Sequence, residues 1–258
     1  MTDLFRDLHH GDRPLLLPNA WDFATGAAFA AAGFAAVGTT SLGVAAAAGK
    51  PDATGDTRAE TLTLARSLAR LTVPVTVDIE GGFSTRPEEV AGLVRELASY
   101  GIAGVNLEDG RADGSLAPLG GQVEIVRAVK EAAPEVFLNA RTDTFWLAQG
   151  EADRDETLRR VRAYADAGAD GVFVPAAADD ADVRALLDAV DVPLNLLFMP
   201  GRTRYARLAE LGVHRVSCGS LPFRRALHAT VAAALEVTEE GRTWPMPSYD
   251  DIQALIEG

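Results

Sequence analysis

The feature that most constrains the fold is a repeated alternation of short apolar runs with segments of helical length. The runs are bounded by glycine, proline and polar residues, as strands are, and each is followed by a predicted helix. Strands that alternate with helices in this way form parallel sheets. The expected strands span residues 15–21, 35–41, 73–80, 104–109, 136–143, 171–175, 192–198 and 215–219.

Eight such units predict a closed (β/α)8 barrel of the TIM type with an extra C-terminal helical segment. The alternative is an open doubly wound sheet, which needs a glycine-rich phosphate loop after the first strand. Residues 19–22 occupy that position and read Asn-Ala-Trp-Asp, which offers no such loop. Because no change in composition marks a boundary, we expect residues 1–258 to form one domain, with 241–258 as a tail that holds a short helix over 249–257.

The composition excludes several classes of protein. The chain has 258 residues, 48% of them hydrophobic, and a net charge of −13 without any basic run, which argues against nucleic acid as a partner. It shows no apolar run long enough to span a membrane and no signal peptide at its N-terminus. The single cysteine, Cys218, excludes an internal disulfide and fits a reducing cytoplasm. An anionic substrate would need a local cation, from a metal or an arginine.

Polar side chains gather where the predicted strands end. On the strand over 73–80, Thr76, Asp78 and Glu80 alternate with apolar residues and are expected to share one face. The carboxyl ends of barrel strands meet at one mouth, where barrel enzymes keep their active sites. The other strand ends add Thr39, Thr40, Ser41, Asn106, Glu108, Asp109, Asn139, Arg141, Asp143 and Asn195.

These residue types favour a metal. Neighbouring carboxylates without a cation repel each other, and their pKa values rise. A divalent metal relieves that repulsion, and carboxylates without a His or Cys cluster favour Mg²⁺ or Mn²⁺ over Zn²⁺. Arg141 can bind a substrate carboxylate with both arms of its guanidinium, or it can form a structural ion pair with Glu108 or Asp143. A metal beside an arginine suits a 2-oxo acid or its enolate.

Four motifs in order resemble the isocitrate lyase/phosphoenolpyruvate mutase superfamily, and the resemblance covers nearly the whole chain. They are Thr40-Ser41-Leu42-Gly43-Val44-Ala45 with Gly49-Lys50-Pro51-Asp52, then Asp78-Ile79-Glu80-Gly81-Gly82, Asn106-Leu107-Glu108-Asp109 and Ala140-Arg141-Thr142-Asp143. The resemblance implies a (β/α)8 barrel that uses Mg²⁺ and an enolate on small anionic carboxylates related to pyruvate. It also implies a homo-oligomer, a dimer or tetramer, in which a C-terminal helix is exchanged.

The resemblance also implies roles for individual residues. Asp78 would bind the metal directly, and Glu80 and Glu108 would support it, partly through water. Residues 40–42 would hold the carboxylate and oxo group of the substrate, and Arg141 would bind its carboxylate. Two further residues are expected at the site, Asp52 as the acid of the loop after the second strand and Asn195 as a substrate contact.

The chain departs from the family in the loop after the fourth strand. The lyases carry Lys-Lys/Arg-Cys-Gly-His there, whereas residues 110–119 read Gly-Arg-Ala-Asp-Gly-Ser-Leu-Ala-Pro-Leu. Of the lysine, asparagine and serine of the phosphonomutases, only Ser115 offers a loose match. The loop composition predicts mobility. We expect Cys218 to be a small core residue, and we expect none of the four histidines to lie at the mouth: His9, His10, His214 and His228.

The sequence therefore predicts a Mg²⁺-dependent lyase that breaks a C–C bond of a small 2-oxo or 2-hydroxy carboxylate through an enolate. Decarboxylation or retro-aldol cleavage needs the least acid–base machinery, and Asp52 or a metal-bound water would move the protons. Two alternatives stay open. One is C–P chemistry, by a phosphoenolpyruvate or carboxyphosphonoenolpyruvate phosphonomutase or a phosphonopyruvate hydrolase. The other is a non-catalytic barrel that binds a carboxylate.

Overall fold

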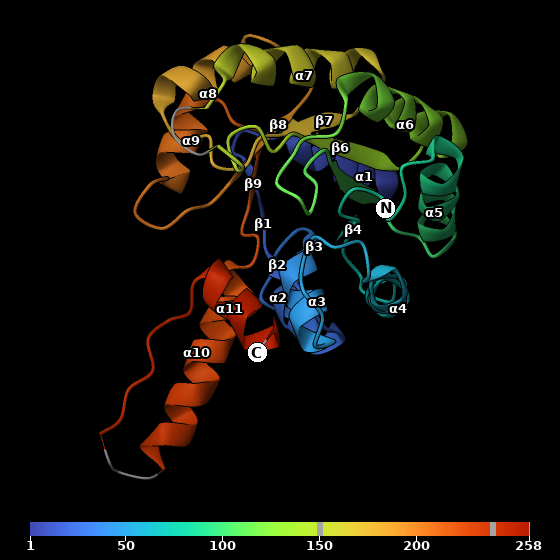
Figure 1. Ribbon diagram of the computed structural model, residues 1–258. Coiled ribbons are helices and arrows are strands. Elements are labelled where there is room, and N and C mark those ends of the chain that lie inside the picture. The colour runs from blue at the N-terminus through green and yellow to red at the C-terminus, as the bar shows by residue number, and fades with distance from the viewer. Residues whose placement is uncertain (149–151, 238–240, 258) are drawn as a thin grey trace.

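The computed structural model describes residues 1–148, 152–237 and 241–257, so the last residue of the expected tail lies outside the described part. Its strands form one parallel sheet in the order β1-β9-β8-β7-β6-β5-β4-β3-β2, with helices around it (Figure 1). The predicted TIM-type barrel is confirmed. The strands are β1 (Leu15–Leu17), β2 (Asn19–Ala20), β3 (Val37–Thr39), β4 (Val75–Asp78), β5 (Gly104–Glu108), β6 (Phe137–Arg141), β7 (Gly171–Phe173), β8 (Leu194–Leu197) and β9 (Arg215–Ser217).

The first strand of the barrel is split in two at Pro18, because proline has no N–H to give to the sheet. The half before it, β1, pairs with β9, and the half after it, β2, pairs with β3. The side chain of Asn19 links the two edges. Its amide donates to the Thr39 carbonyl at 2.7 Å, and its oxygen accepts from the N–H groups of Cys218 and Gly219 at 3.0 and 2.9 Å. The split strand thus joins both ends of the sheet into a nearly closed barrel.

The helices expected between the strands are present, whereas two α-helices and the 3-10 turn η1 (Leu8–His10) were not expected. The N-terminal helix α1 (Thr2–Asp7) inserts the fully buried Phe5 against Phe137, with ring centroids 5.5 Å apart. The second, α3 (Ser41–Ala47), lies in what the sequence suggests is a long loop. The others are α2 (Phe23–Ala31), α4 (Arg58–Leu68), α5 (Pro87–Ser99), α6 (Leu119–Ala132), α7 (Arg154–Asp166), α8 (Asp180–Leu187), α9 (Tyr205–Leu211), α10 (Leu221–Glu236) and α11 (Tyr249–Glu257).

The C-terminal helices differ in how they meet the barrel. Figure 1 shows α10 extending away from the barrel, while α11 turns back and lies beside α3. In α10 only Phe223 is buried, and the rest of the helix is half-buried or exposed. None of the described helices is both long enough and apolar enough to cross a membrane.

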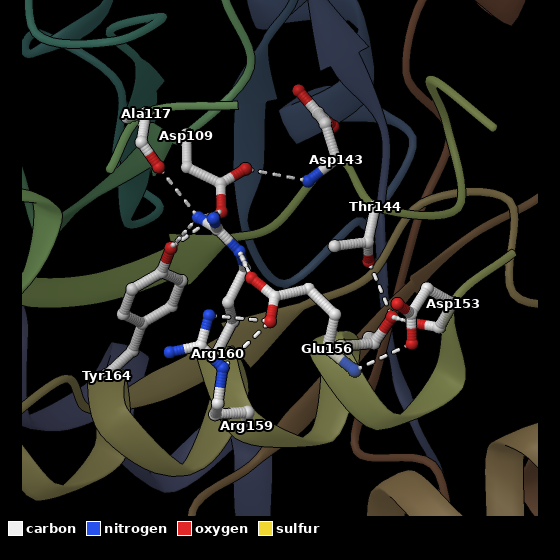
Figure 2. A network of polar contacts seen from close by, with 10 residues as sticks. Asp109, Ala117, Asp143, Thr144, Asp153, Glu156, Arg159, Arg160 and Tyr164 are labelled. Atoms are coloured by element: carbon white, nitrogen blue, oxygen red, sulfur yellow. Dashed lines mark hydrogen bonds and ion pairs between the residues drawn. The ribbon is translucent and has the colours of Figure 1, made fainter. Parts of the chain in front are cut away.

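A buried ionic network connects α7 to the end of β5 (Figure 2). The guanidinium of Arg160 donates to Asp109 at 3.0 Å and to the Ala117 carbonyl at 2.9 Å. The Tyr164 hydroxyl donates to the same Asp109 oxygen at 2.6 Å. The other oxygen of Asp109 accepts the backbone N–H of Asp143 at 2.9 Å. Since Asp109 directly follows β5 and Asp143 lies two residues beyond the end of β6, the network sets the relative position of two strand ends.

Removing the cation from this network is expected to destabilise the fold. The Asp109 side chain is fully buried, so Arg160→Met leaves an uncompensated charge, and we predict a loss of about 3–5 kcal/mol of unfolding free energy. The neighbouring Arg159 also pairs with Glu156, but its side chain is 59% exposed, so Arg159→Met should change stability by about 0–1 kcal/mol. Urea denaturation of both variants measures the difference, and equal midpoints would contradict this account of the network.

Candidate active site

A cavity of about 120 Å³ lies at the carboxyl ends of the strands. Its wall is built by the ends of β3 to β9, by the loop that follows α3, and by α11. The structure therefore brings together residues from distant parts of the chain. Seven predicted site residues line it: Thr40, Ser41, Leu42, Asp52, Asp78, Glu108 and Arg141.

Arg141 ends β6 in the wall of the cavity and forms two ion pairs. It donates to Glu108 and to Asp143, each at 2.6 Å, and Glu108 is its register partner on β5. Burial by itself would lower the pKa of Arg141, but Asp143 and Glu108 outweigh burial and raise it. The expected structural ion pairs are thus present, and the same guanidinium faces the cavity.

Asp78 ends β4, and its position is fixed by the neighbouring strand. Its backbone N–H donates to the Thr39 hydroxyl at 2.8 Å, and its carboxylate accepts the N–H of Glu80 at 3.2 Å. Burial raises the pKa of Asp78 to about 6, with Arg141 opposing the rise. Burial also raises the pKa of Glu108 well above its ordinary value, again against the effect of Arg141. Both carboxylates thus lie where a charge is costly unless a cation is near.

Asp52 reaches the cavity from the loop between α3 and α4. It is 7% exposed, and burial raises its pKa while a hydrogen bond from Tyr249 opposes the rise. The Tyr249 hydroxyl donates to Oδ2 of Asp52 at 2.7 Å, whereas Oδ1 has no partner in the described part of the chain. The next residue, Ala53, has a φ of 60°, a left-handed backbone that residues with a side chain adopt rarely. This strained turn directs Asp52 inward.

The charges around the cavity do not balance. Four carboxylates line it, those of Asp52, Asp78, Glu108 and Asp143, against the two guanidinium groups of Arg111 and Arg141. With all four carboxylates ionised, the deficit equals the charge of one divalent cation. Within the described residues, no three Asp, Glu, His or Cys side chains form a cluster that would hold a metal unaided. Oxygen donors that need completion by water and substrate suit Mg²⁺, which typically takes one or two protein carboxylates.

Glu80 does not lie where the alternation of side chains along a strand predicts. The strand β4 ends at Asp78, and Glu80 has a φ of 49°, so the two acids no longer share a face. The carboxylate of Glu80 instead accepts from the Gly55 N–H at 2.9 Å and from the Thr57 hydroxyl at 2.5 Å. Burial raises its pKa to about 7. Glu80 lines an adjoining depression and anchors the loop that carries Asp52.

Asn195 lies inside the barrel and does not line the cavity. Its side-chain oxygen accepts from the Ser217 hydroxyl at 3.1 Å, while its Nδ2 has no partner among the described residues. Its register partner Arg215 is fully buried and donates to Asn106 at 3.2 Å. The side chain of Asn195 thus takes part in a buried polar layer beneath the cavity. Leu197, two residues further along β8, lines the cavity instead.

The loop after β5 folds back on itself with its own backbone contacts. Gly110 and Leu116 pair as an antiparallel bridge, and Arg111 donates its N–H to the Ser115 carbonyl at 3.0 Å. A side chain at position 110 would meet the carboxylate of Asp143 and force it to shift, so glycine here leaves room for that carboxylate. The loop brings Arg111 into the wall of the cavity, which its composition did not reveal.

Two aromatic residues of the wall were also missed by sequence reasoning. Trp146 follows β6 and Tyr249 begins α11, and no local pattern connects either to the strand ends. The histidines and Cys218 are absent from the described wall, as expected. His9 is a buried packing residue, stacked 4.2 Å from the Phe137 ring. Cys218 is only half-buried, next to the end of β9.

Comparisons with known proteins agree with this geometry. The model of the phosphoenolpyruvate phosphomutase family matches residues 5–238. An uncharacterized protein of Mycobacterium tuberculosis strain H37Rv is 44% identical over 252 residues, which cover 98% of this chain and 95% of the relative. The 2-methylisocitrate lyase of Bacillus subtilis strain 168 is 31% identical over 226 residues, 82% of this chain and 73% of the lyase.

A solved structure shows the same arrangement in three dimensions. The phosphoenolpyruvate phosphomutase of Streptomyces platensis subsp. rosaceus superposes with a TM-score of 0.83 at 26% identity, over 99% of this chain and 96% of that one. The family match spans the whole barrel, including every strand that contributes to the cavity. The chain therefore belongs to the isocitrate lyase/phosphoenolpyruvate mutase superfamily.

Proposed function

We propose that this chain is a Mg²⁺-dependent lyase that cleaves a C–C bond of a small 2-oxo or 2-hydroxy carboxylate through an enolate. The observation that supports this most is the cavity itself. It combines a guanidinium, Arg141, with carboxylates in excess by the charge of one divalent cation. A substrate that carries a carboxylate next to an oxo group matches the guanidinium and the proposed metal. Its anionic end can pair with the guanidinium, and it offers two oxygens to the metal.

The donor set fits Mg²⁺. Asp78 is the proposed ligand, and Glu108 lies in the same wall, where it would orient water around the cation. When bound, Mg²⁺ stabilises the negative charge of an enolate. Glu80 contributes by fixing the loop of Asp52 and not as a ligand.

The chain's own residues then bind the substrate and move the proton. Arg141 holds the carboxylate with charge-assisted hydrogen bonds. Thr40, Ser41 and Leu42 lie at the start of α3 in the same wall and would hold the carboxylate and oxo group of the substrate. Asp52 exchanges a proton with the substrate through Oδ1, the oxygen that has no other partner among the described residues.

The size and lining of the cavity limit which substrates and reactions are compatible with it. A volume of about 120 Å³ suits a small acid. In the described wall neither a cysteine nor a histidine is available to donate a proton to a leaving group. Retro-aldol cleavage or decarboxylation fits this wall, because one acid–base group suffices for either. In retro-aldol cleavage Asp52 would take the proton of the substrate hydroxyl and return it to the carbon of the enolate. In decarboxylation CO2 leaves, and the carbon of the remaining enolate takes its proton from Asp52 or from water.

C–P chemistry is the second candidate. It is supported by the match to the phosphoenolpyruvate phosphomutase model and by the likeness to the Streptomyces enzyme of that name. A mutase rearranges its substrate without releasing phosphate, whereas a phosphonopyruvate hydrolase releases inorganic phosphate. The products therefore separate the candidates.

The test is a substrate panel followed by NMR, with oxaloacetate, 2-methylisocitrate and related hydroxy acids on one side and phosphonopyruvate on the other. We expect C–C cleavage products that vanish with EDTA, because the enolate needs Mg²⁺. Asp78→Asn should lower the rate at least about 100-fold, since it removes the proposed ligand. The matched control is Asp188→Asn, on the exposed end of α8, which should keep the wild-type rate.

Each other result of the panel has a definite meaning. Turnover of phosphonopyruvate alone would replace the lyase with C–P chemistry. Cleavage that persists in EDTA and in Asp78→Asn would contradict the metal assignment. Binding of oxo acids without any turnover would leave a non-catalytic carboxylate-binding barrel.

We also propose that the chain assembles with copies of itself by exchanging α10. Figure 1 shows this helix extending away from its own barrel. Beyond the buried Phe223, its Ala-rich face, with Val231 and Ala234, is half-buried or exposed. On the barrel, the outward-facing Leu16 of β1 is 36% exposed, so part of the outer face of the sheet lacks a cover. The α10 helix of a second copy supplies an apolar surface of the required kind.

Light scattering after gel filtration tests this assembly. The wild type should have the mass of a dimer or tetramer of the 27.2 kDa chain. Val231→Glu should shift it toward the monomer, because a charge would enter the apolar interface. Ala181→Glu places the same charge on the exposed surface of α8 and should leave the mass unchanged. A monomeric wild type would refute the exchange.

A further inference from the structure

The C-terminal helix α11 is held firmly against the mouth of the barrel. Ile252 is 1% exposed and packs in a cluster with Leu42 and Phe223. Ser248 and Asp251 fix the start of the helix, since the Ser248 N–H donates to the Asp251 carboxylate at 2.8 Å and the Asp251 N–H donates to the Ser248 hydroxyl at 3.1 Å. The segment before it is tied to α10, where Arg224 donates to the Pro247 carbonyl at 3.1 Å. The helix thus has a defined position.

From this position α11 contacts Asp52 at three points. The Tyr249 hydroxyl donates to the Asp52 carboxylate at 2.7 Å. Gln253 accepts the Asp52 N–H at 3.0 Å and donates to the Asp52 carbonyl at 3.5 Å. Tyr249 and Gln253 are four residues apart, so they lie on the same face of the helix. Tyr249 therefore orients the carboxylate of Asp52, and Gln253 holds the backbone of Asp52.

The same tyrosine forms part of the cavity wall. Its ring meets Trp146 edge to face, with centroids 6.0 Å apart and an angle of 81° between the rings. Both residues line the cavity, and Trp146 is 39% exposed, so the pair lies between the interior and solvent. With Oδ2 of Asp52 bound to Tyr249, the unpartnered buried Oδ1 is the oxygen left for a ligand. A phenylalanine at position 249 would keep this packing and lose only the orientation of the carboxylate.

We infer that α11 is a working part of the active site, in which Tyr249 and Gln253 are positioning residues that hold Asp52 for proton transfer. The inference rests on the proposed function, because it gives Asp52 the proton that the enolate reaction moves. Tyr249 orients the carboxylate, so its loss should act on kcat. Gln253 holds the backbone of a loop that has a left-handed residue, Ala53, next to Asp52. Its loss should loosen that loop.

The kinetics of the Tyr249→Phe variant test the role of Tyr249 in orienting the Asp52 carboxylate. We expect kcat to fall about tenfold, the effect of losing one hydrogen bond to a charged group, with KM nearly unchanged. In Asp52→Asn the same change should have no further effect beyond about twofold, because Tyr249 acts through Asp52. Tyr100→Phe is the matched control, since that hydroxyl bonds Glu96 on the surface. A wild-type kcat in Tyr249→Phe, or additive losses in the double variant, would overturn the inference.

Amide hydrogen exchange tests the role of Gln253 in holding the backbone of the Asp52 loop, and it requires no enzymatic turnover. Gln253→Ala should speed exchange of the peptide over residues 50–57 at least about fivefold, whereas Tyr249→Phe should leave it unchanged. Unchanged exchange in Gln253→Ala would refute the role of Gln253. If the wild type converts no member of the panel, the proposed function fails by itself. Exchange then decides whether α11 holds the Asp52 loop, because this readout needs no substrate.

Discussion

The structure of the barrel mouth depends on the need to bury acidic side chains close together. Asp78, Glu108 and Asp143 come from the ends of adjacent strands, and burial raises the pKa of all three. Arg141 offsets part of the cost of burial by pairing with Glu108 and Asp143. The Asp109–Arg160 pair fixes the ends of β5 and β6, which carry these two acids. What remains is an excess of negative charge in a small cavity. That excess is the physical basis for the proposed metal, and a cation is what would let an anionic substrate enter.

The barrel could be predicted because its evidence is local and repeated. Each apolar run followed by a helical segment is a separate observation, and eight of them leave few arrangements. The structure differs from this prediction where the fold depends on features other than the alternation of apolar and helical segments. Pro18 divides the first strand while the barrel still closes around it, through the side chain of Asn19. The helix α3 does not follow from the sequence pattern, because its glycine and alanine residues show no periodic apolar face.

The alternation of side chains along strands predicted only the part of the candidate site that strands carry. The roles of Asp52 and residues 40–42, which lie outside the strands, were predicted from the family resemblance, and the contribution of the chain terminus was not predicted. Asp78, Glu108 and Arg141 follow from their strands, since parallel strands end at one edge. Glu80 lies one residue beyond Ile79, past the end of β4, where strand alternation no longer applies and a positive φ turns the chain. Tyr249 is 197 residues from Asp52 in the sequence, and only the folded chain shows that they meet. Sequence spacing carries no information about such a contact.

The central claim is that the cavity binds an enolate-like dianion together with Mg²⁺. The most direct measurement is the thermal stability of the wild-type chain with oxalate, a mimic of the pyruvate enolate, in the presence of Mg²⁺ or of EDTA. A ligand of the native state raises stability with the logarithm of its concentration. The account predicts a rise in melting temperature that grows with oxalate and requires Mg²⁺. An equal rise in EDTA, or no rise with both present, would contradict it.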